Sequence, residues 1–285
     1  KFKEPGASRV TVLSAFLLGL VQGVAEFLPI SSSGHLSIAQ NLLGLSVGGE
    51  DLFFDVLLHL GTLAAVLVAY WGDVIELVGE LFRGIGDLAQ HRTPDPVPPS
   101  RRLLLLLAVG TLPLFAVLPV QEQVESLYGN LPFIGGALLM TGVLLFAADR
   151  VRRGRATEKS VSLLDVLLVG VGQAIATVPG ISRSGMTIAS GCLLGFDRRF
   201  AVRFSFLLSI PAVLGANLLH LVKAAQTGID WSLLPVYGVG LVTAALSGYF
   251  CIRLLRLVAE KGKFGYFAYY CWAAGIFTLV LTAIK

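Results

Sequence analysis

Long apolar stretches, separated by short polar ones, occupy most of this chain of 285 residues. Six of them are long enough to cross a bilayer as α-helices, which takes about 20 apolar residues. They cover residues 52–71, 103–120, 131–148, 200–223, 233–257 and 264–284. The pattern therefore predicts an all-α polytopic membrane protein with six transmembrane helices, and residues 1–285 form a single integral membrane domain.

Two further apolar stretches are interrupted by proline. The first begins at Val10, breaks at Pro29 and continues as a short helix to about Leu43. The second occupies residues 163–195 and breaks at Pro179. Each half is short for a full crossing, so we predict two re-entrant helical hairpins that enter and leave the membrane on the same side.

The basic residues lie mainly in one set of polar stretches. This set comprises 72–102, which begins as an amphipathic surface helix and ends in a Pro-rich linker, 149–162, Arg198, Arg199, Lys261 and Lys263. The other set, 46–51, 121–130 and 225–231, contains no Lys or Arg. The positive-inside rule makes the first set cytoplasmic, so both termini are predicted outside and the first hairpin opens outward. Lys1, Lys3 and Arg9 are exceptions.

Composition supports a membrane location. Hydrophobic residues make up 55% of the chain and charged residues 14%, against about 25% charged in soluble domains. The basic residues behind the net charge of +4 lie mainly in the loops between the predicted spans, and a nucleic acid partner is not expected. Three cysteines lie in apolar runs without metal-binding spacing, which indicates core positions.

Two polar motifs interrupt the apolar background, and one is a copy of the other. Gln22 to His35 reads QGVAEFLPISSSGH, and about 151 positions later Gln173 to Met186 reads QAIATVPGISRSGM. Three predicted spans, an odd number, separate the copies, so the two hairpins enter from opposite sides. We predict an inverted repeat, with repeat 1 at about 10–149 and repeat 2 at about 162–284, whose broken helices meet near the bilayer midplane.

The differences between the copies suggest chemistry. Ser32 becomes Arg183 in the second copy, His35 becomes Met186 and Glu26 becomes Thr177. Ser32 and His35 are three residues apart at a helix start, so we predict that His35 acts as general base and that Ser32 is the nucleophile or positions a water. The alternative for His35 is a helix-terminal histidine bonded to a backbone carbonyl. Glu26 orients His35, shares in proton transfer or binds a divalent cation, Mg²⁺ or Ca²⁺. Arg183 holds a phosphoryl group, or it only neutralises Glu26.

Both motifs also place free backbone N–H groups at helix N-termini, which attract phosphate. The candidate substrate-binding residues are Gln22, Ser31, Ser33, Gly34, Ser182, Ser184, Gly185 and Thr187. For the serines, helix capping alone is an equally good interpretation. Asp55 and His59 are interpreted as a structural hydrogen bond, with a second proton-handling pair as the alternative. Arg203 is interpreted as an interfacial residue, with phosphate binding as the alternative.

QGVAEFLPISSSGH, followed by PGISRSGMT and FSFLLSIP, resembles the undecaprenyl-diphosphate phosphatase family, the bacitracin-resistance type of bacterial membrane phosphatase, over essentially the whole chain. The resemblance implies hydrolysis of the terminal phosphate of undecaprenyl diphosphate, which recycles the lipid carrier for wall polymers. It also implies a location in the bacterial inner membrane, where the loop charges predict an active site open to the outer side. The family motifs match Gln22, Glu26, Ser31, Ser32, Ser33 and His35, and Pro179, Gly180, Ser182, Arg183, Ser184 and Thr187. Gln22 replaces a Glu of many members, which weakens a metal site built from two carboxylates.

A lipid flippase or secondary transporter is the main alternative, because inverted repeats with broken helices are typical of such carriers. The asymmetry between the two motifs favours an enzyme, since transport needs no Ser/His pair opposite an Arg. A purely structural scaffold would leave the buried polar cluster unexplained. The oligomeric state is open, with a homodimer as one option.

Overall fold

The structure is a computed structural model, and it describes residues 10–45, 52–92, 94, 96–151, 153–227, 230–261 and 263–284. Within these residues it is a bundle of helices, and the only β-type pairing is an isolated bridge between Ala156 and Phe196. Six segments of this part are long and apolar enough to cross a membrane. The predicted all-α polytopic class with six spans is confirmed. Lys1, Lys3, Arg9 and the loop 46–51 lie outside the described residues.

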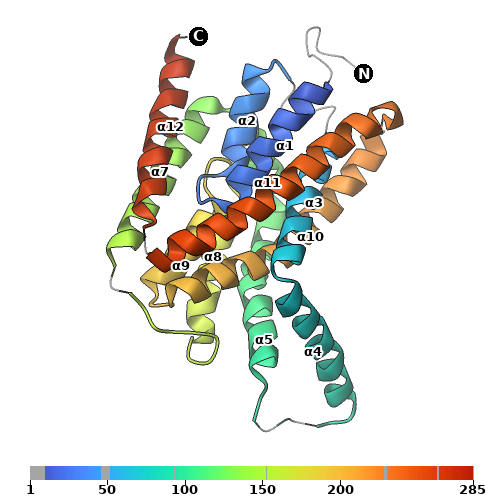
Figure 1. The fold of residues 1–285 in the computed structure, drawn as a ribbon, viewed down its shortest axis with the longest axis vertical. Helices are drawn as coiled ribbons and strands as arrows, with labels where there is room; N and C mark the ends of the chain where they lie inside the picture. Colours follow the sequence, from blue (N-terminus) through green and yellow to red (C-terminus); the bar gives the residue numbers. More distant parts are fainter. Residues whose placement is uncertain are drawn as a thin grey trace.

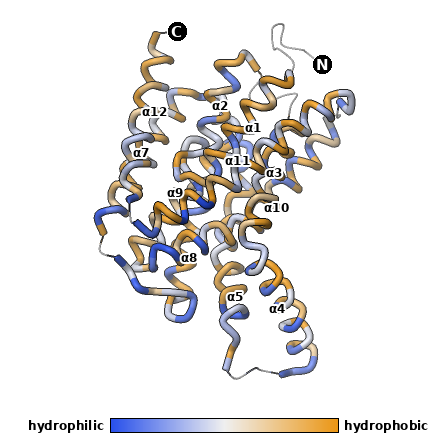
Figure 2. The backbone as a smooth tube through the Cα atoms, in the orientation of Figure 1, coloured by the Kyte–Doolittle hydropathy of each residue, from blue (hydrophilic) through white to orange (hydrophobic). Residues whose placement is uncertain are grey.

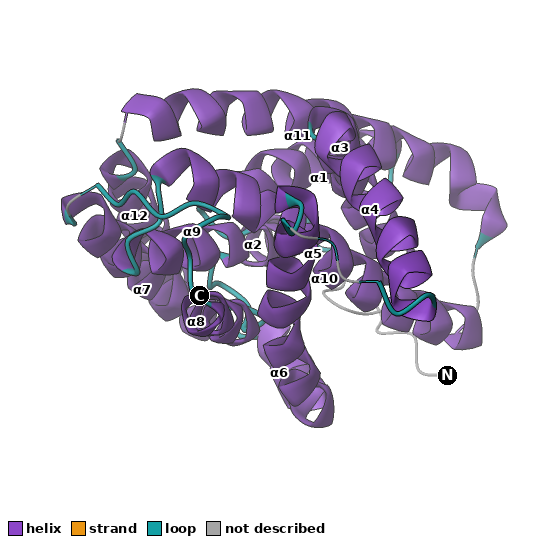
Figure 3. Cartoon of the chain, turned by 90° about the horizontal axis from the view of Figure 1, so that it is seen from below, coloured by secondary structure: helices purple, strands orange, loops and turns teal. Residues whose placement is uncertain are grey.

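Figure 1 shows the order of the helices. They are α1 (Val12–Phe27), α2 (Ser32–Leu42), α3 (Leu52–Ala69), α4 (Trp71–Ala89), α5 (Pro99–Thr111), α6 (Gln121–Ser126), α7 (Leu131–Arg150), α8 (Leu163–Ile175), α9 (Arg183–Leu193), α10 (Arg198–Thr227), α11 (Leu234–Lys261) and α12 (Gly265–Ile284), with 3₁₀ segments η1 (Leu112–Val120), η2 (Leu127–Gly129) and η3 (Trp231–Leu233). Figure 3 shows the same bundle from below.

The span predicted at 103–120 is not one α-helix. It consists of α5, which ends at Thr111, and the 3₁₀ segment η1. Pro113 and Pro119 explain the change, because a proline lacks the N–H that an α-helix needs and its ring clashes with the preceding turn.

The predicted amphipathic surface helix is α4, which ends at Ala89. Together with α5 it projects from the bundle, and Figure 2 shows hydrophilic residues along α4 and in the loop beside α8. The Glu80 side chain of α4 is buried and accepts a hydrogen bond from Arg101 Nε of α5 at 2.6 Å. This partly buried ion pair joins the two projecting helices.

Both proline-broken stretches form helical hairpins. In each hairpin the two short helices, α1 with α2 and α8 with α9, pack against each other. The first turn includes Ser31 at φ +73° and the second includes Gly180 at φ +89°, a left-handed conformation that sharpens both turns. α1 has 16 residues and α8 has 13, fewer than a full crossing needs. Their re-entrant course through a bilayer stays a prediction.

The first helix of each hairpin packs against a long span from the other half of the chain. A Cβ on Gly19 of α1 would lie 2.5 Å from the carbonyl oxygen of Gly240 on α11. A Cβ on Gly170 of α8 would lie 2.4 Å from the carbonyl oxygen of Gly110 on α5. Gly170 follows Gly19 at the offset of the duplicated motifs, so both hairpins dock through the same glycine contact.

This docking predicts that Gly19→Ala destabilises the protein. The added methyl group overlaps the Gly240 carbonyl oxygen, which belongs to backbone that cannot rotate away, so α1 and α11 must separate. We expect a loss of about 1–3 kcal/mol, measured as a lower midpoint of thermal unfolding in detergent. Gly136→Ala is the matched control, because a Cβ on Gly136 of α7 meets no atom within 4 Å. Equal midpoints for the two variants would contradict the proposed contact.

Candidate active site

The carboxylate of Glu26 is where the two hairpins meet. Glu26 lies in the last turn of α1 and is 6% exposed. One of its oxygens, Oε2, accepts hydrogen bonds from Ser32 Oγ of α2 at 2.6 Å and from Gln22 Nε2 at 3.0 Å. The other oxygen, Oε1, is bound by the guanidinium of Arg183, the first residue of α9. The structure thus brings a hydroxyl, a carboxylate and a guanidinium from three helices to one point.

Local sequence explains this convergence. Gln22 and Glu26 are four residues apart and share a face of α1, so one can bond the other. Pro29 prevents α1 from continuing, and the turn returns the chain so that α2 begins at Ser32, beside the end of α1. The N-terminus of α9 begins at Arg183 and faces the same carboxylate, so two helix N-termini with free N–H groups flank the site.

Ser31 and Ser182 are helix caps. Ser31 Oγ accepts from the backbone N–H of Gly34 at 3.2 Å, and Ser182 Oγ accepts from that of Gly185 at 3.0 Å. Both hydroxyls therefore cap their own helices, and their predicted contact with substrate stays a prediction.

Ser33 and Ser184 connect the two hairpin tips. Ser33 Oγ accepts from the backbone N–H of Gly180 at 3.4 Å, and Ser184 Oγ donates to the carbonyl oxygen of Leu28 at 3.3 Å. The contacts are nearly reciprocal, because each hairpin reaches the turn of the other. These two serines hold the tips together.

The two motif glycines permit the same close approach. A Cβ on Gly34 would lie 3.2 Å from Gly180 Cα, and one on Gly185 would lie 3.3 Å from Pro29 Cβ. Larger side chains at either position would force the turns apart, and with them Arg183 and Glu26.

The expected pairing of Ser32 with His35 is not found. Ser32 donates to Glu26, while the ring nitrogens of His35 lie 2.8 Å from the carbonyl oxygen of Ser31 and 2.9 Å from the hydroxyl of Tyr270. Residues three apart share a helix face, but Ser32 is the first residue of α2 and its side chain reaches past the helix end to Glu26. Glu26, rather than His35, is therefore positioned to receive the proton of Ser32.

Thr187 is buried behind the site. Its hydroxyl lies 2.6 Å from that of Ser205 and 2.9 Å from the carbonyl oxygen of Arg183. It therefore joins α9 to α10, and its predicted contact with substrate stays a prediction.

His59 Nδ1 lies 2.8 Å from the backbone carbonyl oxygen of Asp55. The hydrogen bond expected between these two residues thus involves the main chain of Asp55, consistent with a structural role.

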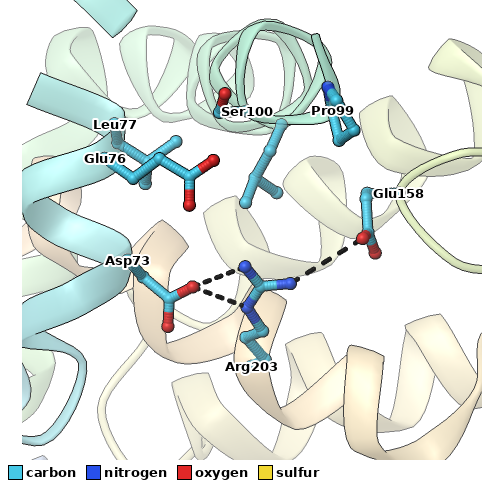
Figure 4. Close-up of a pocket in the computed structure, with 8 residues that line it drawn as sticks. Asp73, Glu76, Leu77, Pro99, Ser100, Glu158 and Arg203 are labelled. Atoms are coloured by element: carbon cyan, nitrogen blue, oxygen red, sulfur yellow. Dashed lines mark hydrogen bonds and ion pairs between the residues drawn. The ribbon is translucent and has the colours of Figure 1, made fainter. Parts of the chain in front are cut away.

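Arg203 does not reach the site. It lines a separate pocket of about 180 Å³ between α4, α5 and α10, shown in Figure 4. There its guanidinium donates to Asp73 Oδ1 at 3.0 and 2.5 Å, and it lies 3.9 Å from Glu158. With Glu76 also in the lining, carboxylates outnumber the one cation, so this pocket disfavours phosphate.

Two residues that contribute to the site were missed in the sequence. Thr141 of α7 accepts a hydrogen bond from Ser182 N at 3.2 Å, and its hydroxyl lies 3.3 Å from the Gly180 carbonyl oxygen. Tyr270 of α12 contacts His35. Both lie in ordinary apolar spans far from the motifs, so no local pattern marked them.

The donor set around Glu26 offers a divalent cation a single carboxylate. Both oxygens of Glu26 accept from N–H and O–H donors, and the amide of Gln22 stands beside it. Across the part of the chain that the structure describes, no group of three His, Cys, Asp or Glu side chains is placed to hold a metal ion. The tentative assignment of Glu26 as a metal ligand gains no support, and no step is derived through a cation.

Fold and site together define a multi-pass helical membrane protein in which two broken helical hairpins build a partly buried Ser/Glu/Arg cluster. The family model described as bacitracin resistance protein BacA matches residues 15–277, and the chain belongs to this family. This confirms the family resemblance seen in the motifs.

Similar proteins include three named undecaprenyl-diphosphatase. That of Methanosphaera stadtmanae is 40% identical over 284 residues, covering 96% of this chain and 99% of that protein. Those of Halothermothrix orenii and Syntrophotalea carbinolica are 38% and 42% identical, covering 96% and 93% of this chain and 99% and 97% of theirs.

Proposed function

We propose that this protein hydrolyses undecaprenyl diphosphate to undecaprenyl phosphate and inorganic phosphate. The names of its relatives support the substrate. The observation that carries the proposal is the Ser32 hydroxyl, 2.6 Å from a carboxylate that also binds Arg183. A hydroxyl beside a base and a fixed cation is suited to phosphoryl transfer.

In the first step Glu26 accepts the proton of Ser32, whose oxygen attacks the terminal phosphorus. A bond forms between Ser32 Oγ and phosphorus, the bond from phosphorus to the bridging oxygen breaks, and undecaprenyl phosphate leaves with the electron pair. Water then attacks the phosphoserine: a bond forms between the water oxygen and phosphorus, and the bond from phosphorus to Ser32 Oγ breaks. Glu26 returns its proton to Ser32 Oγ, the water gives up a proton to solvent, and inorganic phosphate leaves. If Ser32 instead orients a water that attacks directly, no phosphoserine forms. Labelled phosphate trapped on Ser32 distinguishes the two routes.

Arg183 and the helix ends stabilise the negative charge of the phosphoryl group. The guanidinium has five N–H donors in a planar fork, so it can hold Glu26 and phosphate oxygens together. The N-termini of α2 and α9 add backbone N–H groups and the positive ends of two helix dipoles. The cluster thus suits a polyanionic head group, and the prenyl chain can remain in the surrounding lipid.

The test is phosphate release from undecaprenyl diphosphate by the purified protein in detergent, where no membrane gradient exists. We expect turnover by the wild type and none above background by Ser32→Ala. Wild-type protein that releases no phosphate would reject the function. Phosphate release in detergent would also show activity that needs no membrane gradient, which a transporter does need. No feature of the site favours the transport alternative.

We also propose that the site opens to the outer face of the bacterial inner membrane and takes its substrate from the outer leaflet. Two variants test this orientation. Gln123→Cys lies in the polar stretch 121–130, which contains no Lys or Arg, and Lys159→Cys lies in the basic stretch 149–162. The three native cysteines are buried and give little background labelling. In intact cells with a permeable outer membrane, an impermeant maleimide should label Cys at 123 and not at 159. The reverse pattern would invert the orientation. A homodimer stays a prediction.

A further inference from the structure

His35 makes a contact with Tyr270, which lies 235 residues further along the chain on α12. Its Nε2 atom lies 2.9 Å from the phenol oxygen. The two rings are stacked, with centroids 5.6 Å apart and planes 16° from parallel. The imidazole is therefore held both by its edge and by its face.

The other ring nitrogen of His35 decides the direction of this hydrogen bond. Nδ1 lies 2.8 Å from the carbonyl oxygen of Ser31, and a carbonyl oxygen can only accept, so Nδ1 carries a proton. In the neutral imidazole Nε2 is then the acceptor, and the hydroxyl of Tyr270 donates to it. Ser31 and Tyr270 together select one tautomer, in which the basic nitrogen faces away from α2.

We propose that Tyr270 is a positioning residue, which acts in phosphate release by fixing the tautomer and ring orientation of His35. The proposal rests on the proposed phosphatase function. His35 follows the site residue Ser32 by one helical turn of α2, and its basic nitrogen is the one that Tyr270 holds. With the tautomer fixed, the proton that the hydrolytic water loses as it attacks the phosphoserine can pass to the Tyr270 oxygen while the Tyr270 hydroxyl gives its own proton to His35 Nε2, and the imidazolium then releases a proton to solvent.

The activity test uses Tyr270→Phe, which keeps the stacked ring and removes only the hydroxyl. We expect kcat for phosphate release to fall about tenfold, with KM within about twofold, and the pH profile of kcat to shift. In a His35→Gln background the same substitution should have no further effect, because the partner is gone. Tyr269→Phe is the control, since Tyr269 is also half exposed and packs on Phe146 and Trp272. It should retain wild-type kcat.

Unchanged kcat in Tyr270→Phe, or an equal loss in the His35→Gln background, would overturn the positioning role. Wild-type protein that releases no phosphate would reject the phosphatase function separately.

The chain has only four histidines, so ¹⁵N-histidine NMR in detergent gives a readout independent of turnover. The ¹⁵N signal of His35 is identified as the one that disappears in His35→Gln. We expect the resonance of its unprotonated nitrogen to change its chemical shift in Tyr270→Phe and not in Tyr269→Phe. No shift in Tyr270→Phe would overturn the proposal.

Discussion

Glu26→Gln should lower kcat for phosphate release by about 10²- to 10⁴-fold, the usual contribution of a general base. The amide has nearly the same shape as the carboxylate and can still accept a hydrogen bond from Ser32, but it cannot take the proton. The substitution also keeps the site filled, so the protein should remain folded. Phosphate release at saturating substrate, with the elution volume in size-exclusion chromatography as a check of folding, measures the effect.

Glu76→Gln provides the matched control for this prediction. Glu76 is an exposed carboxylate on α4 that lines the Arg203 pocket, and Figure 1 shows α4 well away from α2, the helix that carries Ser32. Its variant should retain wild-type kcat. If Glu26→Gln retained more than a tenth of the activity while His35→Gln lost it, the base would be His35, as the sequence alone suggested.

Arg183→Ala should remove both activity and stability. Loss of the guanidinium removes the cation that would stabilise the phosphoryl group, and we expect kcat to fall by about 10²- to 10³-fold. It also leaves the buried Glu26 without its counter-ion, and an uncompensated buried charge typically lowers the free energy of unfolding by about 3–5 kcal/mol. Phosphate release and thermal unfolding in detergent measure the two losses.

A double variant separates the catalytic role of Arg183 from simple neutralisation of Glu26. In Glu26→Gln combined with Arg183→Ala no buried charge is left unpaired, so the unfolding midpoint should return most of the way to wild type. Activity should stay as low as in the single variants. Recovery of turnover together with stability would show that Arg183 serves only to neutralise the carboxylate.

Several parts of the fold could be predicted because they depend on local properties of the chain. The length of an apolar run determines whether it can cross a bilayer, and this predicted all six spans. Pro29 and Pro179 marked both hairpin turns because proline disfavours the interior of a helix, which it kinks or breaks. Pro113 carried the same signal, but it lay in so apolar a run that the span was interpreted as one helix.

The sequence predicted which residues make up the candidate site, but not how they pair. The duplicated motifs single out Glu26, Ser32 and Arg183, and the structure brings these three together. The partner of Ser32 was predicted wrongly, because spacing along a helix describes neighbours on that helix only. Glu26 contacts Ser32 across the turn at Pro29, and the backbone angles of that turn determine how close the two side chains lie.

The sequence by itself determined a helical membrane protein, two matched hairpins and the residue types of the reaction centre, since hydrophobic run length and repeated motifs are written along one chain. Only the tertiary structure decided that Glu26 binds Ser32, that Tyr270 binds His35 and that Thr141 supports the second turn. The reason is geometric. A hydrogen bond requires two atoms within about 3 Å, and for residues on different helices that distance depends on how the helices pack.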